Sequence, residues 1–366
     1  MTKPMRTLFA LLMLFFAGRC SAQDVIAFLD YMDRLHVFDR GVFRQIDHRK
    51  PQWVRYGGNK VVYADAQADL VVYERGEVRK VDDQAGSDVV VTDHFIGFTV
   101  AGMFKVYDTK PRMLSGVVGP HLTEDSIAAF KDNIQQTVGI YYNGASQVIE
   151  DQLAGNAMLQ WAAGDNLLAW VSAYDRRFKV FYHGSIIELS DLVTEMQFKC
   201  GLDMVAYQDA SDMSFKVFYK GEVYDLEPQM PKRYEVGKGV MAWMDQTGAL
   251  KVFDGKLVHT AMSFEPAKWA VADSLVVIED RQFFNVFTNG RMHMVERVVP
   301  QQWQASWGSL AYVDVDRTLK IWRNGRAEVV LRGQPVQEFV LDRGLLLARL
   351  NQTTAKVWWR GQLYEH

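Results

Sequence analysis

One short pattern recurs ten times along nearly the whole chain, and this recurrence constrains the fold more than any other feature. The pattern is a β-branched or aliphatic residue, an aromatic, two further residues and then Gly. Successive aromatics are separated by 34 to 40 residues. A fixed period in this range is typical of solenoids, propellers and repeat arrays. The aromatics of the ten copies are Phe38, Tyr73, Tyr107, Tyr141, Phe181, Phe218, Phe253, Phe287, Trp322 and Trp358.

A second anchor precedes each of these aromatics by 9 to 11 residues. It is a mostly large apolar residue that follows a small or aliphatic one. Two anchors held at nearly constant separation ten times indicate one structural unit that is repeated. The second anchors are Phe28, Tyr63, Phe98, Phe130, Trp170, Tyr207, Trp243, Ile278, Tyr312 and Ala348.

Turn residues separate the anchored segments. Asp245-Gln246-Thr247-Gly248 lies between the two anchors of its unit, and Asn143-Gly144, Asn289-Gly290 and Asn324-Gly325 follow the repeat aromatic of theirs. Asn-Gly pairs favour tight hairpins, and period-2 alternation between turns indicates strands rather than helices. Each unit therefore predicts four short antiparallel strands. Four strands in about 35 residues, repeated about ten times, predict an all-β fold, a β-propeller.

The chain resembles the TolB-type and WD40-like propellers of bacterial envelopes. One unit illustrates the resemblance: it runs from Tyr234 through Ala242-Trp243 and the turn at 245–248 to Leu250-Lys251-Val252-Phe253. The resemblance covers the strand order of almost all of residues 24–366. It implies the propeller architecture only, and it assigns no functional residue.

The number of units leaves the arrangement of the ring open. Ten units exceed the usual four to eight blades, and the first unit lacks room for a first strand ahead of Val25-Ile26-Ala27-Phe28. One large ring, two tandem five-bladed propellers and a ring with degenerate units are all compatible with the repeats. No Pro/Gly/Ser-rich linker divides the chain, which favours one continuous repeat domain over residues 23–366.

The first 22 residues have the features of a secretory signal peptide. Lys3 and Arg6 give a positive start, an apolar run follows, and Cys20-Ser21-Ala22 offers small residues for cleavage. Lipidation at Cys20 is an alternative, which Arg19 disfavours. No second hydrophobic span follows, so we expect an exported protein, periplasmic or secreted, without a transmembrane segment after cleavage.

Composition argues against several functions. The net charge is −3 with both signs interspersed, so the basic patch of a nucleic-acid-binding protein is missing. The eight His residues do not occur at ligand spacings and no Cys cluster accompanies them, so we expect no metal site and no cofactor. Cys200 is the only Cys after cleavage, and we expect a buried, inert thiol.

Residues that depart from the repeat near the first strand of a unit are candidates for a ligand site, because residues shared by all units maintain the blade. Together they predict a polar, ligand-binding face around the central channel. These candidates are Trp53, Arg55, Lys199, Glu235, Lys238, Lys268, Gln301, Gln302 and Trp307.

Carboxylates near the same strands are candidates for catalysis if two of them face each other in the channel. Several align with turns, where Asp commonly caps the backbone, and no motif assigns a catalytic residue. The carboxylates are Glu124, Asp125, Asp165, Glu195, Glu235, Asp273 and Asp342.

The sequence therefore favours a non-catalytic propeller that binds or scaffolds a protein or glycan partner in the bacterial envelope or exterior. The alternative is a propeller-fold hydrolase or lyase that acts on carbohydrate or peptide through channel carboxylates. Fold alone does not distinguish the two.

Overall fold

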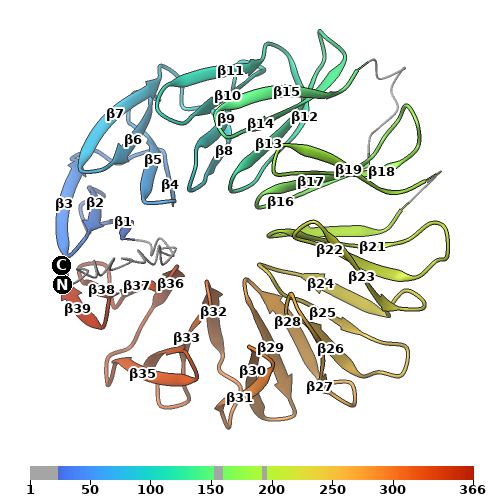
Figure 1. Cartoon of the computed structure of the whole chain (residues 1–366). Helices are drawn as coiled ribbons and strands as arrows, with labels where there is room; N and C mark the ends of the chain where they lie inside the picture. The colour runs from blue at the N-terminus through green and yellow to red at the C-terminus, as the bar shows by residue number, and fades with distance from the viewer. Residues whose placement is uncertain (1–23, 152–159, 192–195) are drawn as a thin grey trace, which may run out of the picture.

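Ten antiparallel sheets follow one another around a central opening in the computed structural model, which describes residues 24–151, 160–191 and 196–366 (Figure 1). Each sheet is one blade, numbered 1 to 10 in chain order. All elements in this part of the chain are strands, none of them a helix. The predicted all-β propeller is confirmed. The predicted signal peptide at residues 1–22 lies outside the described residues.

Each blade from 2 to 10 contains four strands in chain order, from the first strand to the fourth. Strands such as β8, β16 and β36 border the opening, whereas β3, β7 and β39 lie on the outer rim (Figure 1). The first strands are β4 (Trp53–Gly57), β8 (Ser87–Val91), β12 (Val118–Thr123), β16 (Trp161–Gly164), β20 (Phe198–Gly201), β24 (Arg233–Val236), β28 (Lys268–Ala272), β32 (Gln302–Ser306) and β36 (Glu338–Asp342).

The second and third strands carry the two anchors of the repeat. The second strands are β1 (Val25–Leu29), β5 (Lys60–Ala64), β9 (Ile96–Val100), β13 (Ile127–Asp132), β17 (Leu167–Val171), β21 (Met204–Gln208), β25 (Met241–Met244), β29 (Leu275–Asp280), β33 (Ser309–Val313) and β37 (Leu345–Arg349). The third strands are β2 (Leu35–Asp39), β6 (Leu70–Glu74), β10 (Met103–Tyr107), β14 (Thr137–Tyr142), β18 (Phe178–Tyr182), β22 (Phe215–Tyr219), β26 (Leu250–Phe253), β30 (Phe283–Thr288), β34 (Leu319–Arg323) and β38 (Ala355–Trp359).

The fourth strands form the rim and are more exposed than the others. They are β3 (Val42–Asp47), β7 (Glu77–Asp82), β11 (Pro111–Ser115), β15 (Ala145–Glu150), β19 (Ser185–Ser190), β23 (Glu222–Glu227), β27 (Val258–Met262), β31 (Arg291–Glu296), β35 (Arg326–Leu331) and β39 (Gln362–Glu365). Blade 1 has three strands, β1 to β3, within the described residues. Within the described residues the first unit is one strand short, in agreement with the sequence analysis.

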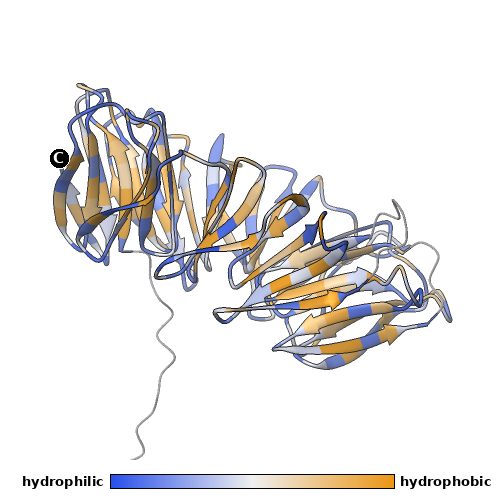
Figure 2. Cartoon of the chain, turned by 90° about the horizontal axis from the view of Figure 1, so that it is seen from above, coloured by the Kyte–Doolittle hydropathy of each residue, from blue (hydrophilic) through white to orange (hydrophobic). Residues whose placement is uncertain are grey.

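The hydrophobic core is divided among the blade interfaces. Ten clusters of buried residues occur, and each joins two neighbouring blades. Trp243, for example, is fully buried between blades 6 and 7. Burying an aromatic side chain of this size contributes roughly 2–3 kcal/mol. The anchors recur because every interface needs them, and the apolar segments fill the blade interior (Figure 2).

Blades 10 and 1 close the ring through side chains. Ile26, Phe38 and Val357 share one buried cluster, and Trp359 Nε1 donates to Asp24 Oδ1 at 2.9 Å. The ends of the described chain consequently lie side by side (Figure 1). The blades thus form one ring, and the blades of this ring do not share one plane (Figure 2).

Candidate functional site

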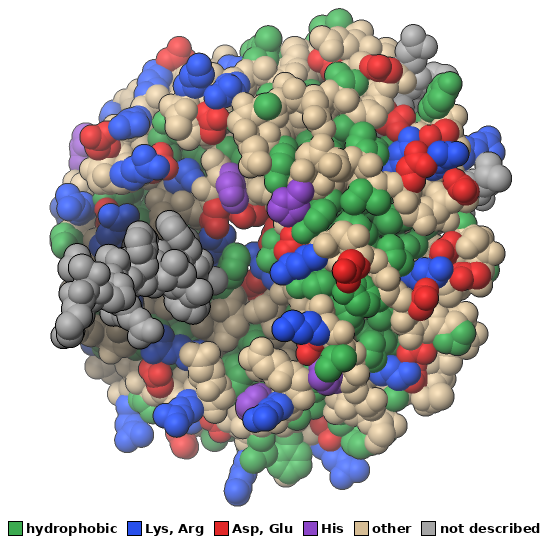
Figure 3. Space-filling model, in the orientation of Figure 1, with side chains coloured by type: hydrophobic (Ala, Val, Ile, Leu, Met, Phe, Trp, Pro, Cys, Tyr) green, Lys and Arg blue, Asp and Glu red, His purple; other side chains and the backbone are tan. Residues whose placement is uncertain are grey.

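The turns between the first and second strands of the blades surround the central opening. We call them the central turns, at residues 58–59, 92–95, 124–126, 165–166, 202–203, 237–240, 273–274, 307–308 and 343–344. Acidic, basic and histidine side chains gather around this opening (Figure 3). Antiparallel strands of nearly equal length bring these turns to the same end of the channel, although they come from nine blades.

From blade 2 to blade 10, each central turn or a residue flanking it is hydrogen-bonded to the next blade around the ring. Backbone contacts dominate between blades 4 and 8, where Ser126 N donates to Asp165 O at 2.7 Å and Lys238 N donates to Asp273 O at 2.7 Å. Between other blades a side chain takes part in the hydrogen bond; for example, Trp307 N donates to Asp273 Oδ2 at 2.9 Å. The remaining links are Asp24 N to Asn59 Oδ1, Lys60 Nζ to Asp93 O, Asp93 N to Asp125 Oδ1, Asp203 N to Asn166 Oδ1, Leu202 N to Gly237 O and Arg343 N to Ser306 Oγ.

Glycine at the end of the first strand permits this close approach in several blades. A Cβ placed on Gly164, Gly201 or Gly237 would collide with a carbonyl oxygen of the next blade. The three residues end the first strands of blades 5 and 6 and follow that of blade 7. Blades 5 to 8 therefore make backbone-to-backbone contact beside the channel.

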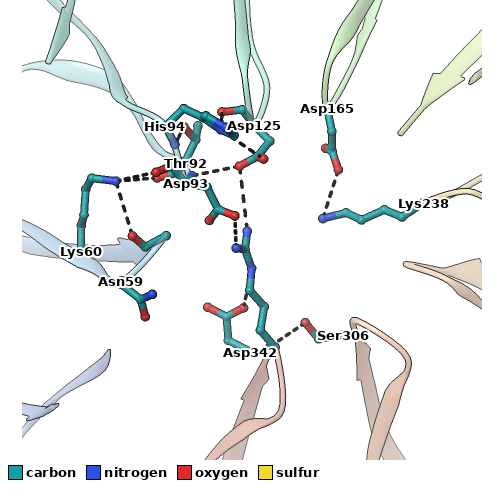
Figure 4. A network of polar contacts seen from close by, with 12 residues as sticks. Asn59, Lys60, Thr92, Asp93, His94, Asp125, Asp165, Lys238, Ser306 and Asp342 are labelled. Atoms are coloured by element: carbon teal, nitrogen blue, oxygen red, sulfur yellow. Dashed lines mark hydrogen bonds and ion pairs between the residues drawn. The ribbon is translucent and has the colours of Figure 1, made fainter. Parts of the chain in front are cut away.

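Arg343 reaches from blade 10 to Asp93 of blade 3 and Asp125 of blade 4, both of which Figure 4 labels. Its guanidinium forms an ion pair with Asp93 Oδ2 and lies 3.9 Å from Asp125 Oδ1 and 4.0 Å from Asp342 Oδ1. The Arg343 side chain is 12% exposed. A guanidinium can serve several carboxylates at once because its donors diverge in one plane. We call this group of four residues the cross-ring clasp.

Lys238 and Trp307 lie beside the clasp. Lys238 Nζ is 3.2 Å from Asp165 Oδ2 and 3.7 Å from Asp273 Oδ1. The Trp307 ring lies beneath both cations, 4.6 Å from Lys238 Nζ and 4.9 Å from the Arg343 Cζ atom. Cation–π contact of this kind adds about 1 kcal/mol when water is partly excluded.

Lys60 is the most buried cation at this end of the channel, with 3% of its surface exposed. Its Nζ donates to Asp93 O at 2.9 Å and to Thr92 O at 3.2 Å. Burial lowers the pKa of Lys60. The ammonium therefore donates its hydrogen bonds to the backbone of the neighbouring blade.

Glu124 is the exception among these charges, because no hydrogen bond or ion pair joins its carboxylate to another described residue. Burial and the neighbouring Asp165 raise the pKa of Glu124 to about 7. Burial also raises the pKa of Asp165 and of Asp342, partly offset by Lys238 and Arg343 respectively. By contrast, Asp125 has a lowered pKa, because hydrogen bonds from His94 and the Asp93 amide outweigh its burial. Carboxylates with divergent pKa values in one cavity can work as acid and base.

The predicted ligand residues fall into four groups. Lys238 and Trp307 meet at the central turns, as described above. Lys199 and Glu235 instead connect first strands of neighbouring blades: Lys199 Nζ donates to Tyr234 O at 2.9 Å, and Val271 N donates to Glu235 Oε2 at 2.8 Å. Trp53 packs on the core between blades 2 and 3, and the Arg55 side chain on β4 is exposed.

Lys268, Gln301 and Gln302 come together at the opposite end of the channel. They line a cavity of about 430 Å³ at the start of β28, β32 and β36. Lys268 Nζ pairs with Glu279 Oε1 at 3.1 Å. The nine predicted residues therefore do not form one site. Of the predicted carboxylates, Glu195 lies outside the described residues.

Several important residues were missed by sequence reasoning. Arg343, Asp93, His94 and Lys60 were not among the candidates, although Arg343 holds the same place before Gly as Trp307 does in the preceding repeat. That correspondence was the available signal for Arg343. Cys200 lies on β20 with Sγ 3.3 Å from Ala162 O, and burial raises the pKa of its thiol. No cluster of three potential metal ligands occurs among the described residues.

Fold and site together define a large β-propeller whose central turns are tied by hydrogen bonds and ion pairs. Residues 19–364 match the family described as the 10-bladed beta propeller domain, and the chain belongs to that family. No curated protein matches the sequence. Within the described residues, we find no helix with the length and apolarity needed to cross a membrane.

Among solved structures, the computationally designed Ika8 protein is 18% identical, with a TM-score of 0.34, 74% of this chain and 95% of that chain covered. Hsv2p of Kluyveromyces lactis is 11% identical, with a TM-score of 0.33 and 67% and 97% covered. The CRINKLY WD40 ectodomain of the Arabidopsis thaliana receptor kinase ACR4 is 12% identical, with a TM-score of 0.33 and 66% and 96% covered. Scores this low carry no argument about function.

Proposed function

We propose that the protein is an exported, non-catalytic propeller that binds or scaffolds a partner in the bacterial envelope or exterior. The carrying observation is the contrast between the two ends of its channel. The cations at the central turns are already paired with protein groups, whereas Gln301 and Gln302 line an open cavity. Paired charges stabilise the ring, and unpaired amides facing solvent suit recognition.

The proposal is tested with the whole chain, residues 1–366, carrying a C-terminal affinity tag. It is expressed in the source cells, so that the predicted leader at residues 1–22 is present. Cell fractionation comes first, and export predicts recovery outside the cytoplasm. Chemical cross-linking and purification from the envelope then identify partners by mass spectrometry. A partner that co-purifies equally with wild type and with Glu124→Gln supports binding without catalysis. Cytoplasmic retention, or no partner in repeated purifications, contradicts the proposal.

A second candidate function rests on one observation, the raised pKa of Glu124 beside Asp165. A carboxyl group with a pKa of about 7 is suited to general acid catalysis, and a neighbouring carboxylate can act as base or nucleophile. A hydrolase or lyase acting on carbohydrate or peptide would use this pair.

The enzyme alternative is tested with polysaccharide and peptide substrates. Turnover that falls at least about 100-fold in Glu124→Gln, the usual scale for loss of a general acid, would support catalysis. Glu265→Gln is the matched control, because Glu265 is exposed in the loop between β27 and β28. Undiminished turnover in Glu124→Gln would remove Glu124 from any mechanism.

A further inference from the structure

Three cavities on the face opposite the central turns join into one groove. The cavity of about 430 Å³ shares Gln301 and Gln302 with a cavity of about 580 Å³ in blade 9. It shares Gln337 and Glu338 with a third cavity of about 360 Å³ between blades 10 and 1. The lining comes from starts of first strands, from turns between second and third strands, and from the loops that enter each blade. Antiparallel connectivity places all of these on one face.

One end of the groove carries exposed aliphatic side chains beside Asp314 and Arg317. Val298 and Val315 are 49% and 66% exposed, and Pro335 lies exposed beside them. Val299 and Val336 form the floor, where they pack on the cores of the blade interfaces. Each exposed aliphatic side chain that a ligand covers contributes about 25 cal/mol per Å² of apolar area. This end therefore suits an aliphatic side chain.

The middle of the groove consists of amides. The side chains of Gln301, Gln302 and Gln337 make no hydrogen bond to any residue within the described segments. A primary amide both donates and accepts, which matches the alternating N–H and C=O groups of a peptide backbone. Gln304 already uses its amide in this way on the protein itself, donating to Phe339 O at 2.9 Å and accepting from Leu341 N at 2.9 Å.

The third part of the groove carries exposed acids. The Asp33 side chain is 53% exposed and pairs with Lys50 at 3.1 Å. The Glu338 side chain is 62% exposed and pairs with Arg349 at 3.3 Å. Exposed ion pairs contribute only about 0–1 kcal/mol, so a basic side chain of a ligand can take the place of Lys50 or Arg349. Tyr31, 64% exposed, lies at the same end.

The aromatic residues of the groove argue for peptide over sugar. Trp303 contacts the Phe284 ring at 5.8 Å in the core between blades 8 and 9, and Phe339 is 5% exposed. Both residues line the cavity, but their rings are engaged in the interface cores, which leaves less ring surface for the stacking that a sugar favours. The aliphatic end and the amides instead match alternating side chains and backbone.

We propose that this groove binds an extended peptide segment of a protein partner, with an aliphatic residue at the Val298–Val315 end, an uncharged middle and a basic residue near Asp33 and Glu338. The inference rests on the proposed binding function and names its ligand class. It places recognition on the face away from the cross-ring clasp.

The test uses the mature chain, residues 24–366, and a random-peptide phage library. Peptides selected on wild type are synthesised, and their Kd is measured on wild type and on the groove variant Gln302→Ala/Val315→Asp. The matched control is Gln147→Ala/Val148→Asp on β15, where both residues are exposed on the rim and Val148 is 51% exposed. Circular dichroism confirms that each variant is folded. A triple variant, Gln301→Ala/Gln302→Ala/Gln337→Ala, replaces the groove variant if the introduced Asp prevents folding.

We expect selected peptides to carry an aliphatic and a basic residue and to bind the groove variant at least about tenfold more weakly, a change of about 1.4 kcal/mol. The control variant should bind as wild type does. Hydrogen exchange should slow at residues 300–304 and 335–339 when peptide binds. Glu338→Lys should weaken binding of the peptides that carry a basic residue.

The peptide proposal is overturned if no peptide is selected, if selected peptides bind the groove variant as tightly as wild type, or if a glycan array shows groove-dependent capture instead. A separate result decides the proposed scaffold function. A cross-linked partner that binds wild type and groove variant equally leaves the scaffold role intact and removes the groove from it.

Discussion

The two ends of the central channel use polar residues in opposite ways. At the central turns, Arg343 and Lys238 form ion pairs with carboxylates from other blades. Hydrogen bonds also link neighbouring turns from blade 2 to blade 10. At the other end, Gln301, Gln302 and Gln337 face a groove with their amides unpaired among the described residues. The charged side chains of the central turns hold the protein together, whereas the uncharged amides at the other end are left open to a ligand.

The difference shows that charge beside a propeller axis does not by itself indicate a ligand site. A buried ion pair whose partners come from distant blades restricts how those blades move. An unpaired amide costs little in solvent and is available to a ligand. A polar side chain can either stabilise the ring or bind a ligand. Whether it already has a partner within the protein therefore distinguishes these two roles better than its charge does.

The largest effect should come from Arg343→Ala. Removing the guanidinium leaves Asp93, Asp125 and Asp342 close together without their shared cation, and breaking such a pair costs about 3 kcal/mol. Urea denaturation measures the free energy of unfolding. Arg291→Ala, at an exposed position on β31, is the control and should change it by less than about 0.5 kcal/mol. Equal stability of the two variants would contradict a structural role for the clasp.

Gly237→Ala should have the next largest effect. The added Cβ would collide with Asp273 O, so blades 7 and 8 must separate, and overpacking of this kind costs about 2 kcal/mol. Gly116→Ala is the control, because the nearest atom to its Cβ would be Ile134 Cδ1 at 3.8 Å. If thermal denaturation gives the same Tm for both variants, close blade contact is not essential at the channel.

Glu124→Gln should change stability in the opposite direction, and only at higher pH. The pKa of Glu124 is raised from 4.5 to about 7 in the folded protein, so wild type loses stability as pH rises through that window. The Glu124→Gln variant has no carboxyl group to ionise at this position, so it does not lose this stability. After discounting for solvent screening, the variant should be more stable by about 1 kcal/mol above pH 7 and unchanged below pH 4.5. Denaturation at several pH values, with Glu265→Gln as control, measures the difference; a pH-independent effect would contradict it.

The smallest effect on stability should come from Gln301→Ala/Gln302→Ala/Gln337→Ala. These exposed amides support no neighbouring residue, so we expect a change of less than about 0.5 kcal/mol. Urea denaturation checks this result alongside Arg343→Ala. A loss comparable to that of Arg343→Ala would mean that both ends are structural, and it would remove the contrast on which the proposed function rests.

The repeat made the fold predictable because every blade interface solves the same packing problem. Aromatics such as Phe218 and Trp243 recur at fixed positions since each must fill an equivalent interface. The missing strand of blade 1 followed from counting residues ahead of Val25. Local sequence was sufficient for these features, because strands within a blade pair with their neighbours in the chain.

The site was less predictable because its contacts join residues far apart in the chain. Arg343 and Asp93 are separated by 250 residues, and no local pattern links them. Lys199 and Glu235 depart from the repeat, and the side chains of both bond to the next blade. Departure from a repeat therefore identifies a special position without revealing which partner the side chain has.

The closure between blades 10 and 1 has a mechanical consequence. Every other interface joins blades that are consecutive in the chain, whereas this one is held by noncovalent contacts alone. A pulling force applied at residues 24 and 366 would load this interface first. Because Arg343 in blade 10 also forms an ion pair with Asp93 in blade 3, part of the load passes directly between these two blades. The cross-ring clasp thus opposes separation of blades 10 and 1 when the ring is under load.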